Sequence, residues 1–160
     1  RLPAGETGEI YMRRPEGAPA TYHYLGAESK PLEGGWESIG DIGWLDSDGY
    51  LYLADRRTDM ILVGGANVYP AEVEAAIDDH PLVGSSCVIG LPDDDLGNKV
   101  HAIVQAKPGL TEADLFAHLA ERLVIYKRPR TIEFTEEPLR DDAGKVRRSQ
   151  LREDRIRARG

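Results

Sequence analysis

The pattern of apolar residues changes near residues 56–59, and this change constrains the fold more than any other feature of the 160-residue chain. Residues 1–58 contain short apolar stretches separated by glycine and proline, which is typical of strands joined by turns. From residue 59 to residue 157, strand-like and helix-like segments alternate. This alternation predicts an α+β fold: a compact domain over residues 59–160 with a small central β-sheet flanked by helices, preceded by the β-rich residues 1–58.

The β-rich part contains a clear hairpin signal. Asp48-Gly49 separates two apolar stretches and supplies the positive φ angle that a tight turn requires. Such a hairpin would bring Asp41 and Arg56 close to one sheet edge. Residues 14–38 are rich in glycine and proline and predict a loop. The predicted strands are residues 8–13, 41–46 and 50–55.

The second part has recognisable helix starts. Pro70 suits the first position of a helix, and Glu72 and Glu74 follow where the helix dipole favours acidic side chains. Thr111 and Asp114 have the spacing of a capping box at the start of a second helix. Predicted strands are residues 60–63, 85–91, 100–106 and 131–135, and a short arginine-rich helix is predicted near residues 148–157.

The charge of the chain is unevenly distributed. The formal net charge is −8, yet residues 140–160 carry 8 basic and 4 acidic side chains, so the remaining residues 1–139 are strongly acidic. An acidic body repels a nucleic-acid backbone, which argues against a nucleic-acid partner. The short basic segment therefore favours a local, small anion as its target.

The single cysteine, Cys87, lies in an apolar stretch and is predicted to be a buried thiol, which fits a reducing, cytoplasmic location. No stretch reaches the ~18 to 20 apolar residues of a transmembrane helix, and no signal peptide is visible. The chain begins with Arg1 rather than methionine. We therefore expect it to be a piece of a longer protein.

Four short stretches could carry chemistry. Asp41 follows Gly40, and its carboxylate could accept two hydrogen bonds from a ribose. Arg56 follows the next strand and suits a nucleotide hydroxyl or phosphate. Gly64-Gly65 forms a glycine loop before a helix, and Lys145 lies on a glycine turn from which its ammonium could reach an anion.

Each stretch also has a purely structural interpretation. Asp41 could be a turn residue, Arg56 a solvated charge, Gly64-Gly65 a hairpin turn, and the Lys145 segment a solvated basic loop. The Walker motif is absent. The four histidines are scattered without metal-ligand spacing, so no metal site is predicted.

In order, these stretches resemble the AMP-forming adenylating superfamily, which comprises acyl-CoA synthetases, peptide-synthetase adenylation domains and beetle luciferases. The resemblance covers nearly the whole chain. It rests on five ordered blocks, namely GETGEI at residues 5–10, the block from Trp36 to Tyr50, the block from Asp55 to Glu74, YKRPR at residues 126–130, and Gly144-Lys145-Val146.

The resemblance implies a role for each candidate residue. Asp41 would hold the ribose of ATP, and Arg56 would also bind the nucleotide. Lys145 would bridge the substrate carboxylate and the α-phosphate, and Gly64 and Gly65 would lie near the pantetheine arm of CoA in the second half-reaction. Thr58 falls at the domain hinge, where the family usually has Asp or Lys, and this departure leaves the hinge mechanics open.

The resemblance also implies what the parent protein does. Residues 1–58 would be the end of a large N-terminal domain, which is the partner missing here, and residues 59–160 a mobile C-terminal domain. The parent would be a carboxylic acid–CoA ligase for a fatty, bile-acid-like or other hydrophobic acid, using ATP, Mg²⁺ and CoA. The phosphate loop and acyl pocket are absent, so we expect this piece alone to have no ligase activity; whether it binds a nucleotide by itself stays open.

Two alternatives remain: a peptide-synthetase adenylation domain, and a non-catalytic docking module with the same fold. The chain ends 15 residues after Lys145 in an arginine-rich segment, which favours a free-standing ligase over a synthetase that continues into a carrier domain. Exposed strands of residues 1–58 could also pair two copies into a homodimer.

Overall fold

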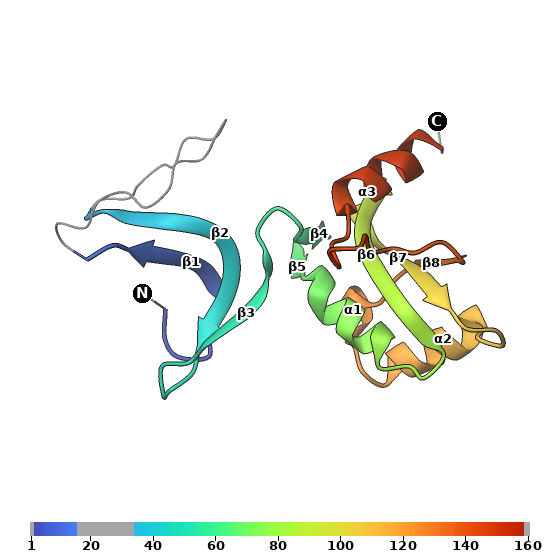
Figure 1. Cartoon of the computed structure of the whole chain (residues 1–160), viewed down its shortest axis with the longest axis horizontal. Coiled ribbons are helices and arrows are strands. Elements are labelled where there is room, and N and C mark those ends of the chain that lie inside the picture. Colours follow the sequence, from blue (N-terminus) through green and yellow to red (C-terminus); the bar gives the residue numbers. More distant parts are fainter. Residues whose placement is uncertain (1, 16–33, 159–160) are drawn as a thin grey trace. The chain divides into compact units, whose positions relative to one another are not determined.

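A computed structural model describes residues 2–15 and 34–158 of the chain. They form two compact units, Arg1–Thr58 (unit 1) and Asp59–Gly160 (unit 2), and each is described by itself (Figure 1). The fold class predicted from the sequence is confirmed: the described residues form three α-helices and three small sheets, one of which is mixed. Within the described ranges, no helix has the length and apolar character needed to cross a bilayer.

Unit 1 is a three-stranded antiparallel sheet in the order β1-β2-β3. Its strands are β1 (Gly8–Arg13), β2 (Trp36–Leu45) and β3 (Leu51–Arg56). The predicted hairpin is present, and the Asp46 carboxylate accepts backbone hydrogen bonds from Asp48 and Tyr50 across its turn. The prediction that the loop extends to residue 38 was wrong, because Trp36 pairs with Arg13 in the sheet; most of that predicted loop lies outside the described residues.

Unit 1 has little core of its own. Among its described residues, Ile42 is the only buried hydrophobic side chain, with 7% of its surface exposed. Unit 1 has a mainly apolar pocket with a volume of about 590 Å³, lined by residues that include Leu2, Trp36 and Leu51. The large hydrophobic side chains left exposed in unit 1 are Leu2, Met12, Trp36, Leu45, Tyr50, Leu51, Tyr52 and Leu53.

Unit 2 is built on a three-stranded sheet in the order β6-β7-β8, in which β6 and β7 are antiparallel and β7 and β8 parallel. A separate two-stranded hairpin, β4-β5, precedes it. The elements in chain order are β4 (Ile61–Val63), β5 (Ala66–Val68), α1 (Pro70–Asp78), β6 (Val83–Asp93), β7 (Gly97–Ala106), α2 (Glu112–Ala120), the 3₁₀ turn η1 (Ile125–Lys127), β8 (Thr131–Thr135) and α3 (Arg148–Arg157).

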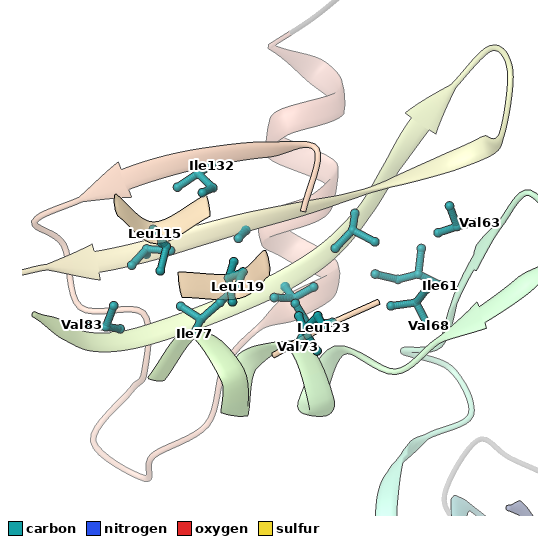
Figure 2. Packing of buried hydrophobic residues seen from close by; sticks show 14 residues of the cluster. Ile61, Val63, Val68, Val73, Ile77, Val83, Leu115, Leu119, Leu123 and Ile132 are labelled. Carbon is teal, nitrogen blue, oxygen red and sulfur yellow. The ribbon is translucent and has the colours of Figure 1, made fainter. Parts of the chain in front are cut away.

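The two faces of the β6-β7-β8 sheet bury different residues, because side chains alternate along a strand. Helices α1 and α2 pack on one face, where Ile77, Leu115 and Leu119 are fully buried against the sheet (Figure 2). The opposite face presents a second cluster of Cys87, Ile89, Leu91 and Ile103, against which residues of the 138–147 loop and of α3 pack. Each face thus has its own helical cover.

The sequence signals for the helices are confirmed in their details. Pro70 is the first residue of α1, and Thr111 and Asp114 form the predicted capping box of α2. Leu123 is also buried, although it lies beyond the end of α2. Glu74 has an environment that the helix-dipole argument did not indicate, because it is buried, with only 8% of its surface exposed. Its negative charge is balanced by the guanidinium of Arg148.

Cys87 is fully buried in the second cluster, on the face of the sheet that α3 covers, which confirms the predicted buried thiol. Burial raises the pKa of this thiol to about 11, although the nearby positive charge of Arg148 opposes the shift. In the unfolded chain the thiol is solvated and has its ordinary pKa of 9.0, so it loses its proton at a pH where the folded state still keeps it. Ionisation of the unfolded chain above pH 9 thus favours unfolding.

The first prediction concerns the stability of the two units. Backbone amides of unit 1 should exchange with solvent faster than those of the β6-β7-β8 sheet, because unit 1 buries few hydrophobic side chains. Hydrogen exchange read out by mass spectrometry on the 160-residue chain measures this difference directly. Equal protection of both units in a monomeric sample would contradict it.

The second prediction concerns pH. Between pH 9 and about pH 10.5, Cys87 should lower the free energy of unfolding by about 1–2 kcal/mol, since the unfolded state binds fewer protons than the folded state. Urea denaturation of the original chain and of Cys87→Ala at several pH values isolates this contribution from lysine and tyrosine titration. Parallel pH profiles for the two proteins would show that the thiol does not contribute.

Candidate functional site

The hairpin of unit 1 places Asp41 directly opposite Arg56 in the β2-β3 pairing. The Arg56 Nε atom lies 3.9 Å from the Asp41 Oδ1 atom, and 77% of the Arg56 side chain is exposed. A long, exposed ion pair of this kind contributes little to stability. Both side chains therefore keep hydrogen-bonding capacity for a ligand.

The next residue, Arg57, has a different environment. Its guanidinium donates to the Glu9 carboxylate at 3.0 Å, and the Ser38 hydroxyl donates to the same carboxylate at 2.5 Å. The Ser38 hydrogen bond, followed by the contacts of Arg57, lowers the pKa of Glu9 and keeps it ionised. Of the two adjacent arginines, Arg57 is thus engaged within the sheet and Arg56 is the more available.

Gly64 and Gly65 form the two-residue turn of the β4-β5 hairpin, so the structural alternative considered above is correct about their local geometry. Their φ angles are +55° and +87°, which residues with a side chain rarely adopt. A β-carbon on Gly65 would meet no atom within 4 Å among the described residues. The turn is therefore open at Gly65, where another group could approach the backbone, whereas a β-carbon on Gly64 would lie 3.1 Å from the Leu96 side chain.

Lys145 lies on a loop whose backbone is held by one carboxylate. Asp141 Oδ1 accepts hydrogen bonds from the backbone amides of Ala143 and Lys145. In the backbone, the Asp141 amide donates to the Lys145 carbonyl, and the Asp141 carbonyl accepts from the Gly144 amide. Gly144 has a φ angle of +73° at the apex of this turn. The loop 141–145 is thus a closed, hydrogen-bonded turn.

The ends of this loop are anchored on the face of the β6-β7-β8 sheet that α3 covers. Leu139 and Val146 pack against the cluster that contains Cys87, and Arg140 donates to Ser85 and to the carbonyl of Gly144. The Lys145 side chain itself is exposed, and its ammonium makes no hydrogen bond or ion pair with the described part of the chain. The Lys145 loop therefore combines an anchored backbone with an exposed ammonium group.

The six predicted site residues fall into two groups. Asp41, Arg56 and Thr58 belong to unit 1, and Thr58 is its last residue. Gly64, Gly65 and Lys145 belong to unit 2. Asp41 and Arg56 are brought together by strand pairing.

Sequence reasoning missed Arg148. Its guanidinium donates to both oxygens of Glu74, at 2.7 and 2.9 Å, and to Asp59 at 2.7 Å. Burial opposes its charge, but the hydrogen bonds and charge of Glu74 raise the pKa of Arg148 above its ordinary value. The available signal was its place two residues after the block Gly144-Lys145-Val146.

The described residues contain no group of three or more His, Cys, Asp or Glu side chains that could hold a metal ion. His101 has a structural environment: its ring is buried, with Nδ1 2.8 Å from the Thr131 hydroxyl and Nε2 3.4 Å from the Glu133 carboxylate. Glu133 is held in turn by Arg155 of α3. This network ties β7, β8 and α3 together.

Comparison with known proteins gives a consistent family. The chain is 38% identical over 154 residues to a fatty acid–[acyl-carrier-protein] ligase of Streptomyces coeruleorubidus, covering 95% of this chain and 30% of that protein. It is 42% identical over 149 residues to a 2-succinylbenzoate–CoA ligase of Geobacillus kaustophilus, covering 92% and 30% respectively. The chain therefore spans about a third of the length of the curated relatives it matches.

Solved structures agree with these relatives. The o-succinylbenzoate CoA synthetase of Bacillus subtilis, in complex with an acyl-adenylate intermediate, matches 94% of this chain and 31% of its own with a TM-score of 0.82 and 34% identity. The family model for the AMP-binding enzyme C-terminal domain matches residues 72–145, from α1 to the candidate lysine. By its sequence and its fold, the chain belongs to the AMP-forming acyl-CoA synthetase family and corresponds to the C-terminal portion of its larger members.

Proposed function

We propose that this chain is the C-terminal part of an ATP-dependent, AMP-forming carboxylic acid–CoA ligase. In this proposal, residues 59–160 are the mobile C-terminal domain and residues 1–58 are the end of the N-terminal domain. The observation that carries it is the exposed, unpartnered ammonium of Lys145 on a hydrogen-bonded turn, at the end of the segment that matches the family model; the ammonium has no partner in the described part of the chain. A charged side chain on a rigid backbone turn suits electrostatic catalysis, in which the cation must be placed before the reaction begins.

An apolar face of unit 1, exposed in its described residues, supports this division. Its exposed hydrophobic side chains, such as Leu51 and Leu53, need a partner surface, and the matched relatives are about three times as long as this chain. We propose that the rest of the N-terminal domain covers this face. A homodimer formed by strands of residues 1–58 is the alternative, and the molecular mass of the full-length protein in solution distinguishes the two.

In the first half-reaction, an oxygen of the substrate carboxylate attacks the α-phosphorus of ATP. A bond forms between that oxygen and phosphorus, the bond to the β-phosphate bridging oxygen breaks, and pyrophosphate leaves with the electron pair. The Lys145 ammonium would stabilise the negative charge shared by the carboxylate and the α-phosphate. Its effect is largest in the transition state, where that charge is concentrated between the two groups.

Asp41 and Arg56 would position the nucleotide. The Asp41 carboxylate can accept hydrogen bonds from both ribose hydroxyls, and the largely exposed Arg56 can turn toward the same nucleotide. Mg²⁺ would arrive bound to the phosphates of ATP and neutralise part of their charge. Because the described residues offer no cluster of ligands for it, we assign the ion to none of them.

In the second half-reaction, the thiolate of CoA attacks the acyl carbon of the acyl-adenylate, the bond from that carbon to the AMP oxygen breaks, and AMP leaves. The two half-reactions require different groups at one place, so a domain rotation at Thr58 would withdraw Lys145 and present the Gly64-Gly65 turn. The open space at Gly65 would admit the pantetheine arm.

The acyl substrate is proposed to be a hydrophobic carboxylic acid, such as a fatty or bile-acid-like acid. The residues that would contact it lie outside this chain, and the relatives named above act on fatty acid and on 2-succinylbenzoate. The 38% identity to an acyl-carrier-protein ligase also makes a carrier-bound thiol a second candidate acceptor. Supplying acyl-adenylate with either CoA or a phosphopantetheinyl carrier protein separates the two acceptors. We also propose a cytoplasmic location, with which the buried free thiol of Cys87 is compatible.

The central test of the proposal is Lys145→Ala in the full-length ligase. It should slow pyrophosphate release by about 10² to 10³, by analogy with other single charge-stabilising groups. Thioester formation from supplied acyl-adenylate should be unchanged, because the lysine is withdrawn in that step. Lys107→Ala is the matched control, since Lys107 is another lysine of unit 2 whose ammonium instead donates to the carbonyl of Pro81. Equal effects of the two substitutions would contradict the assignment of Lys145.

Gly65→Leu should show the opposite pattern. Its bulk would obstruct the approach of the thiol and slow thioester formation, while pyrophosphate release stays near the wild-type rate. Gly65→Ala is the control, because it imposes the same strain at a φ angle of +87° without the bulk. If alanine slows thioester formation as much as leucine does, the effect comes from the strained turn, and the role assigned to the open surface is wrong.

A further inference from the structure

Arg148 joins three separate parts of unit 2. It is the first residue of α3, and 20% of its side chain is exposed. Its Nη2 atom binds both oxygens of Glu74 on α1, its Nη1 atom binds Asp59, and its Nε atom donates to the carbonyl of Val88 on β6. A planar guanidinium can make these bonds at once only in one orientation, so the start of α3 is fixed.

The contact with β6 closes a ring of hydrogen bonds at the edge of the sheet. Among the described residues β6 is an edge strand, and the Val88 backbone amide donates to Glu74 at 2.7 Å while the Val88 carbonyl accepts from Arg148 at 3.2 Å. Glu74 and Arg148 thus satisfy both backbone groups of Val88 and bind each other. This ring covers an edge that would otherwise expose unpaired backbone groups.

The position of Arg148 in the chain gives this ring a second consequence. Lys145 lies three residues before Arg148, and Val146 between them packs on the face of the sheet that α3 covers. Asp59 is the first residue of unit 2 and directly follows Thr58. One side chain therefore connects the backbone next to the proposed hinge with the backbone next to the proposed catalytic lysine.

We infer that Arg148 is a positioning residue for Lys145, which it holds in a fixed geometry relative to the segment at Asp59. This inference rests on the proposed role of Lys145 and adds a residue that acts through it. Arg148 does not itself contact substrate in this assignment, since four of its hydrogen bonds are made to protein groups. Its effect is on where the ammonium stands when the domain closes, and small errors in such placement have large effects on rate.

The test uses Arg148→Lys and Asp59→Asn in the full-length ligase. Lysine keeps the charge but cannot bind Glu74, Asp59 and Val88 together, and Asp59→Asn removes one charge while Glu74 still pairs with Arg148. Each should lower the kcat of pyrophosphate release about 10- to 100-fold without changing the KM for ATP. Thioester formation from acyl-adenylate should be unchanged. Added to Lys145→Ala, either should cause no further loss, because both act through the same ammonium.

Arg152→Gln is the matched control. Arg152 also lies on α3 and donates to the same strand edge, at the carbonyl of Gly90, whereas the described hydrogen bonds and ion pairs of Asp59 and Glu74 with α3 are made by Arg148. It should leave both half-reactions at their original rates. Circular dichroism and thermal unfolding establish that each variant is folded, and Asp59→Asn decides the matter if Arg148→Lys fails to fold.

Two results would overturn the inference. One is a folded Arg148→Lys and a folded Asp59→Asn with the original rate of pyrophosphate release, while Lys145→Ala is impaired. The other is that the Arg148 and Asp59 variants lose rate in both half-reactions, and that Arg152→Gln does so too, with each loss in proportion to the fall in melting temperature. That result would indicate a purely structural role for Arg148. An unimpaired Lys145→Ala would instead refute the proposed function.

Discussion

The ion pair between Arg148 and Glu74 links the parts of unit 2 that set the position of the Lys145 loop. It joins α1, the edge of β6 and the start of α3, and both side chains are largely removed from solvent. Losing one partner of such a pair costs about 3–5 kcal/mol, because the other charge is left buried without compensation. The pair accordingly determines where the two covers of the sheet stand relative to each other, since α1 packs on one face and α3 on the other.

The two units meet different physical requirements. Unit 2 has a hydrophobic cluster on each face of its sheet, and it can therefore serve as a rigid body that carries Lys145 and the Gly64-Gly65 turn together. In its described part, unit 1 has one buried hydrophobic residue and several exposed large hydrophobic side chains. Three strands with one open face are marginal without further packing, so unit 1 depends on a partner surface more than unit 2 does.

The candidate site shows how far local sequence patterns extend. Turn chemistry and strand alternation predicted that Asp41 and Arg56 would lie together, because hairpin pairing is a short-range constraint. The exposed lysine on a glycine turn was also predictable from its neighbours. Arg148 was not, because its importance comes from Asp59 and Glu74, which lie 89 and 74 residues away in the chain.

The sequence by itself determined the strand–helix order apart from the short strand β5, the capping of α2, the hairpin at Asp48-Gly49 and the family. These features depend on residues that are near one another in the chain or on motifs with fixed spacing. The tertiary structure alone decided that Glu74 is buried rather than solvated, and that the edge of β6 is closed by side chains of α1 and α3. Burial of a charge depends on which distant groups surround it, and only the folded chain brings those groups together.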